Sequence, residues 1–171
     1  MSATEYLTFL PLLFYGIALS ELLNKWKRLF YIKTLFIPYA LFTIMLTEIA
    51  LYNVFVFHDL IEGLENIPYF KYLIYLLPPF LFMLEVYVFT PDDETDTESY
   101  YRQHMPKFHT LMGLFILSHF LFEFDEPSSM IGSRIISSIL VIGLGWTRKP
   151  WTVYILFATW LFGLFFKIGI I

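Results

Sequence analysis

Two histidines and a glutamate lie on one face of an apolar segment in the second half of the chain. At about 100° per residue, a helix over residues 108–124 places His109, His119 and Glu123 in one sector, together with Met112 and Gly113. His119 and Glu123 are four residues apart, so their side chains can meet on a helix. Because ionisable groups inside a membrane helix cost free energy, we expect this face to point toward protein or water.

The same residue types raise the question of a metal or a haem. His119 and Glu123 could supply two metal ligands, but a di-iron carboxylate bundle needs Glu-x-x-His pairs, and the sequence has none. His109 and His119 lie roughly 15 Å apart along a helix, and no other predicted span offers a facing histidine to a haem. The chain has no cysteine, which excludes thiolate sites and disulfides. We therefore predict no metal and no cofactor.

Other catalytic patterns are missing. The acidic run DDETDTE has Thr97 and Gln103 where a calcium loop needs Gly and Glu. There is no Gly-rich phosphate loop and no G-x-S-x-G string. Ser133 and Ser137 are four apart, a spacing more typical of a helix-packing face than of a nucleophile.

The polar residues within or beside the apolar segments fall into two predicted layers. The inner layer contains Glu21, Glu85, His104 and His109, and the outer layer contains Glu48, Asn53, His119, Glu123 and Arg134. In the outer layer we expect Glu48 and Arg134 to form an ion pair beside His119 and Glu123. Both layers are candidate binding sites, and the alternative is that their groups only satisfy one another.

The apolar segments that carry these residues are long enough to cross a bilayer. Of the 171 residues, 58% are hydrophobic and 15% are charged, with a mean hydropathy of +0.65; soluble domains carry about 25% charged residues. A bilayer core of roughly 30 Å needs about 20 apolar residues. We predict a single integral membrane domain over residues 1–171, an all-α polytopic transmembrane bundle of six spans, at about 6–23, 34–57, 69–89, 108–124, 130–146 and 151–170. The fourth and fifth segments are short and carry polar residues, so a five-span alternative stays open.

The positive charges give this bundle an orientation. Eight of the 11 Lys and Arg residues flank the first, third and fifth loops: Lys25, Lys27, Arg28, Lys33, Arg102, Lys107, Arg148 and Lys149. The positive-inside rule then places these loops in the cytoplasm and both termini outside, in what we expect to be a bacterial inner membrane.

The polar stretch between the third and fourth segments is predicted to be a short cytoplasmic interfacial helix. Thr90 can cap it with Pro91 at its first position, and Pro106 would end it and begin the fourth span. The alternative is a solvated acidic loop. Within the third segment, Pro78 and Pro79 predict a kink, because neither ring nitrogen can donate a hydrogen bond.

Two strings carry a family resemblance. YGIALSELL, at Tyr15–Leu23, and YYRQHMPKF, at Tyr100–Phe108, resemble a group of uncharacterised bacterial membrane proteins of this size and span pattern. No activity is established for that group, so the resemblance implies a membrane layout and no function.

The function we expect is transport. Inward-facing polar groups at two depths, a proline kink and the lack of a soluble catalytic domain favour a small channel or transporter for an ion or small solute, acting as a homo-oligomer. The alternative is a non-catalytic membrane subunit or sensor that binds a partner protein through its cytoplasmic face. A membrane-embedded enzyme ranks last. The partners we expect are the lipid bilayer and either further copies of this chain or a partner membrane protein. Nucleic acid is excluded by the single small basic cluster.

Overall fold

The computed structural model describes residues 3–30, 35–61, 68–92, 95–121 and 128–167. Every regular element in these ranges is helical. The α-helices are α1 (Ala3–Lys25), α2 (Ile37–Ile61), α3 (Tyr69–Tyr75), α4 (Leu77–Phe89), α5 (Thr97–Ser118), α6 (Ser128–Trp146) and α7 (Thr152–Lys167). Two 3-10 turns, η1 (Trp26–Leu29) and η3 (His119–Leu121), extend α1 and α5.

Three helical stretches are long and apolar enough to cross a membrane. They are Leu7–Leu29, Ile37–Val56 and Tyr69–Phe89, of 23, 20 and 21 residues. Two further apolar helices, Ile131–Trp146 and Thr152–Phe165, are shorter. The described part of the chain is thus all-helical, and its long apolar helices indicate a membrane-associated protein, as the composition predicts.

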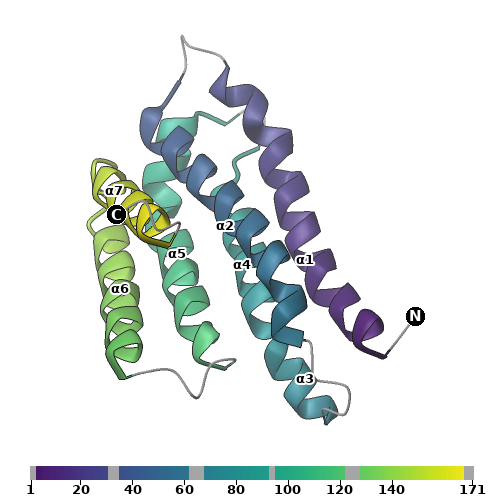
Figure 1. The fold of residues 1–171 in the computed structure, drawn as a ribbon. Helices are drawn as coiled ribbons and strands as arrows, with labels where there is room; N and C mark the ends of the chain where they lie inside the picture. The colour runs from purple at the N-terminus through teal and green to yellow at the C-terminus, as the bar shows by residue number, and fades with distance from the viewer. Residues whose placement is uncertain (1–2, 31–34, 62–67, 93–94, 122–127, 168–171) are drawn as a thin grey trace.

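The helices pack as a bundle in which neighbours in sequence are mostly neighbours in space (Figure 1). α1 packs against α2 and α4, and α4 packs against α5. α6 lies along the far side of α5, and α7 contacts α2 and α6. α5 therefore lies between the first three apolar stretches and α6, which makes it the central element for any internal site.

The third apolar stretch is interrupted where the sequence predicts a kink. α3 ends at Tyr75 and α4 begins at Leu77, with prolines in its first turn. Pro78 and Pro79 cannot donate to the carbonyls of Ile74 and Tyr75, so the hydrogen-bond ladder breaks there. Beyond the break, Phe82, Glu85 and Phe89 form a buried face on α4, as their periodicity predicts.

The predicted interfacial helix is wrong in both of its limits. Thr90 is the C-cap of α4, whereas the N-cap of α5 is Asp96, whose Oδ2 accepts the Ser99 N–H at 2.9 Å. The helix also continues through Pro106 to Ser118, so the polar stretch and the fourth apolar segment share one helix.

Packing explains why Pro106 does not end α5. Proline in a helix interior costs roughly 3 kcal/mol. Tyr101, Met105, Phe108, Met112 and Phe115, at spacings of four and three, are all buried on one stripe that crosses the proline. Burying a large apolar side chain contributes about 1.5–3 kcal/mol, so the stripe outweighs the local cost.

Candidate functional site

A cavity of about 600 Å³ lies among α2, α5, α6 and α7. Its walls are mainly apolar side chains, including Phe42 and Met45 of α2, Met112 and Phe115 of α5, and Leu156 of α7. Six polar or amphipathic groups interrupt them: Glu48, Tyr52, Asn53, Ser137, Thr159 and Trp160. Size and composition are those of a small-molecule pocket, in which a few polar groups orient a mostly apolar ligand.

The carboxylate in this cavity is held by an indole. Trp160 Nε1 donates to Glu48 Oε2 at 3.0 Å, across 112 residues of sequence. The Phe157 ring packs against Trp160 in a tilted arrangement, with ring centroids 5.1 Å apart. One N–H leaves most of the acceptor capacity of a carboxylate unused, so Glu48 can accept a cationic or donor group from a bound molecule.

A second polar group closes one end of the cavity. Asn53 Oδ1 accepts the Tyr15 hydroxyl at 3.2 Å and lies 3.3 Å from His119 Nε2, while its Nδ2 donates to Ile49 O at 2.8 Å. His119 Nδ1 lies 2.9 Å from Phe115 O. A neutral imidazole has one N–H, so the tautomer of His119 decides which of these two contacts is a hydrogen bond.

The outer layer predicted from sequence is therefore only partly assembled in the described residues. Asn53 and His119 meet, and Glu48 and Asn53 line one cavity. Arg134 lies with its guanidinium carbon 5.7 Å from the centre of the Phe120 ring. The Glu48–Arg134 ion pair stays a prediction, since the contacts described for the two residues lead to different partners. Glu123 lies outside the described residues.

Two residues of the predicted inner layer are fully buried. Glu85 and His109 each have 0% relative exposure. Neither Glu85 oxygen has a hydrogen-bond partner among the described residues, and the His109 ring lies beside the Val141 backbone without a hydrogen bond of good geometry. Gly145 of α6 lies directly against His109, where only a glycine leaves room for the ring.

Glu85 and His109 lie at similar heights along α4 and α5, and no contact between them is described. Phe89 packs on Phe108, and Phe82 on Phe115, with centroids 5.3 and 5.2 Å apart. This antiparallel register places Glu85 level with Met112, one helical turn from His109. Met112 itself lines the cavity.

The other two inner-layer residues lie nearer the surface. Glu21 is paired with Lys25 of the same helix at 4.0 Å. His104 stacks on Tyr100 with centroids 4.1 Å apart, and its Nδ1 lies 3.1 Å from Tyr100 O. These two residues therefore do not join Glu85 and His109 in one described cluster.

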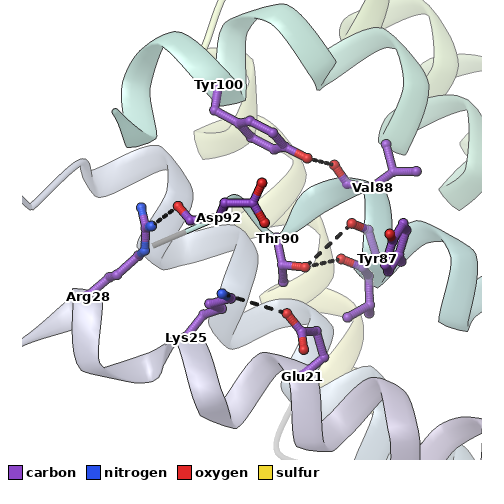
Figure 2. Close-up of polar contacts among 9 residues, drawn as sticks. Glu21, Lys25, Arg28, Tyr87, Val88, Thr90, Asp92 and Tyr100 are labelled. Carbon is purple, nitrogen blue, oxygen red and sulfur yellow. Dashed lines mark hydrogen bonds and ion pairs between the residues drawn. The ribbon is translucent and has the colours of Figure 1, made fainter. Parts of the chain in front are cut away.

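The sequence analysis missed a contact that fastens the α4–α5 connection. Arg28 donates to Thr97 Oγ1 at 2.8 Å, to Thr95 O at 3.2 Å and to the carbonyl of Asp92. Figure 2 shows Arg28 reaching the Asp92 backbone, and the Tyr100 hydroxyl donating to Val88 O, at 2.9 Å. The opposite charges of the first and third loops were the only sequence signal for this contact.

The described residues hold no group of three His, Asp or Glu side chains arranged as a metal site. Comparison with protein-family models, with curated proteins and with solved structures finds no significant match for this chain. The arguments that follow therefore depend on the chain's own geometry.

Proposed function

We propose that this protein is a six-span transporter of the bacterial inner membrane that binds a small, largely apolar solute carrying a cationic or donor group. The observation that supports it is the cavity among α2, α5, α6 and α7, where the Glu48 carboxylate lies among apolar walls. An ionisable group at membrane depth costs free energy and is seldom without a role. The Trp160 indole gives Glu48 a fixed position, which favours a binding site over a group left by chance.

Binding of a lipophilic cation tests this proposal. Tetraphenylphosphonium should bind the purified protein, and Glu48→Gln should weaken that binding at least tenfold, because glutamine keeps the acceptor for Trp160 but has no charge. Glu98→Gln is the matched control, since Glu98 is exposed and pairs with Arg102 on α5. Equal affinities for the wild type and Glu48→Gln would refute the assignment of this cavity.

The six-span topology requires its own test. With both termini outside, single cysteines at Lys27, Thr97 and Arg148 should be protected in intact cells from a membrane-impermeant maleimide. Cysteines at Ser2, Glu62 and Pro127 should react. The chain has no native cysteine, so each label reports one site, and the reverse pattern would refute the orientation.

A partner-binding role is the second candidate. The observation that favours it is the segment fastened by Arg28, which holds a polar surface in place between α4 and α5. An ordered surface loses less conformational entropy when it binds a partner. Arg28→Ala should then abolish co-purification of a membrane partner, while tetraphenylphosphonium binding persists; co-purification unchanged in the variant would remove this candidate.

A further inference from the structure

A second hollow, of about 610 Å³, lies where the start of α2, the first turns of α5 and the α6–α7 turn meet. Its two charged residues are Arg102 and Lys149, and none of its lining residues is acidic. The remaining wall is apolar or aromatic, with Ile37 from α2, Trp151 just before α7 and Tyr154 in its first turn. The hollow shares no lining residue with the cavity that contains Glu48.

Both cations retain donors for a ligand. Arg102 gives Nε and Nη2 to one oxygen of Glu98, at 2.9 and 2.6 Å, and its Nη1 has no partner among the described residues. The Lys149 side chain is exposed, and its ammonium group likewise has no partner within the described part of the chain. An arginine and a lysine with unused donors are the usual ligands of a phosphate group.

The backbone that carries Lys149 is fixed on both sides. The Lys149 N–H donates to Thr147 Oγ1 at 3.3 Å, and the Lys149 carbonyl accepts from the N–H and the hydroxyl of Thr152, at 3.0 and 2.8 Å. Arg148 before it has φ of 55°, an uncommon conformation for a residue with a Cβ atom. The lysine is thus presented from a rigid turn rather than from a loose connection.

The aromatic residues indicate the level in the membrane at which this hollow lies. Trp151 and Tyr154 are 54% and 47% exposed at the start of an apolar helix. Exposed Trp and Tyr at the ends of membrane helices lie at the level of the lipid headgroups. Basic pockets between helices at the cytoplasmic surface bind anionic headgroups, and the charge distribution assigns this end of the bundle to the cytoplasm.

We propose that this hollow binds one anionic phospholipid, with the phosphate between Arg102 and Lys149 and an acyl chain along Ile37, Trp151 and Tyr154. The site depends on the proposed membrane orientation but not on solute transport. Glu98 limits its affinity, because its carboxylate occupies two donors of Arg102.

The test compares lipids by native mass spectrometry of the detergent-solubilised protein. Phosphatidylglycerol should remain bound, and phosphatidylcholine should not. Lys149→Gln and Arg102→Gln should each weaken phosphatidylglycerol binding about fivefold, as expected for one cation near an anionic surface. Glu98→Gln should strengthen it, because it returns donors to Arg102.

Two controls decide the outcome. Lys107→Gln removes an exposed cation of α5 that does not line the hollow, and it should leave binding unchanged. Glycerol phosphate, which has the anion without acyl chains, should not compete. Equal retention of phosphatidylcholine, equal loss in Lys107→Gln, or full competition by glycerol phosphate would each overturn the lipid site, whatever the result with tetraphenylphosphonium.

Discussion

Replacing Gly145 by alanine should destabilise the bundle because the new methyl group has no room. A Cβ atom at this position would lie 2.2 Å from His109 Cβ and 2.6 Å from His109 Cγ. Non-bonded carbons pack at about 3.5–4.0 Å, so α5 and α6 would have to separate by more than about 1 Å. The His109 Cβ is fixed to the helix backbone, and its ring is held between Phe42 and Phe108, with centroids 5.2 and 5.0 Å away. Overpacking of this kind costs about 1–3 kcal/mol.

Gly143, two residues earlier on the same helix, is the control. A Cβ atom there meets nothing within 4 Å, and alanine favours a helix over glycine by roughly 0.5–1 kcal/mol. Both variants gain this helix preference, so Gly145→Ala should be less stable than Gly143→Ala by the overpacking cost, about 1–3 kcal/mol. Thermal unfolding of both variants in the same detergent measures this difference.

Gly113 provides a position where an added methyl group should cause a smaller loss of stability. Its added Cβ would lie 2.4 and 2.6 Å from the Cγ1 and Cδ1 of Ile142, atoms of a flexible side chain. Gly113→Ala should cost less than Gly145→Ala, and Ile142→Ala should relieve it in a double variant. If Gly145→Ala is as stable as Gly143→Ala, the close approach of α5 to α6 is wrong, and the walls of the cavity that depend on it are wrong as well.

Three further predictions concern polar groups of the bundle. The Ser99 N–H holds the pKa of Asp96 below its ordinary value. The stabilisation of α5 by the Asp96 cap should therefore be complete above the ordinary pKa of an aspartate and be lost as the pH falls through the lowered pKa. Asp96→Asn should remove this acid dependence from hydrogen exchange at the start of α5. Tyr15→Phe removes the hydroxyl that donates to Asn53 and should lower the free energy of unfolding by about 1 kcal/mol. Glu85→Gln removes the ionisable group from a fully buried side chain and should leave thermal stability equal or higher at neutral pH, and a large loss would mean that the Glu85 carboxylate has a charged partner.

Much of the helix layout could be predicted from the sequence because span length and face are local properties. The segment over residues 69–89 matches α3 and α4, and its break follows from two prolines that lack N–H donors. The buried faces containing Glu85 and His109 follow from the helical period alone. The predicted helix end at Pro106 was wrong because the sequence shows the helix-breaking preference of proline but not the buried stripe of α5 that crosses it.

The partners of the polar groups could not be predicted in the same way. Trp160 reaches Glu48 across 112 residues, and Arg28 reaches Thr97 across 69. Periodicity fixes the direction of a side chain around its own helix, but the rotation and height of a second helix decide which group it meets. The sequence therefore predicted that Glu48 and Asn53 are turned inward, but it gave no indication that Trp160 would donate to Glu48.

The outer-layer and inner-layer residues differ in their hydrogen-bond partners, and therefore in their ability to bind a ligand. Glu48 and Asn53 are hydrogen-bonded and also line a cavity, so they can exchange one partner for a ligand group at little cost. Glu85 has no partner among the described residues and lines neither hollow. An ionised carboxylate without a partner in such a place costs several kcal/mol or more. A ligand in either hollow would therefore not contact Glu85, whereas a ligand in the first cavity would meet Glu48 and Asn53.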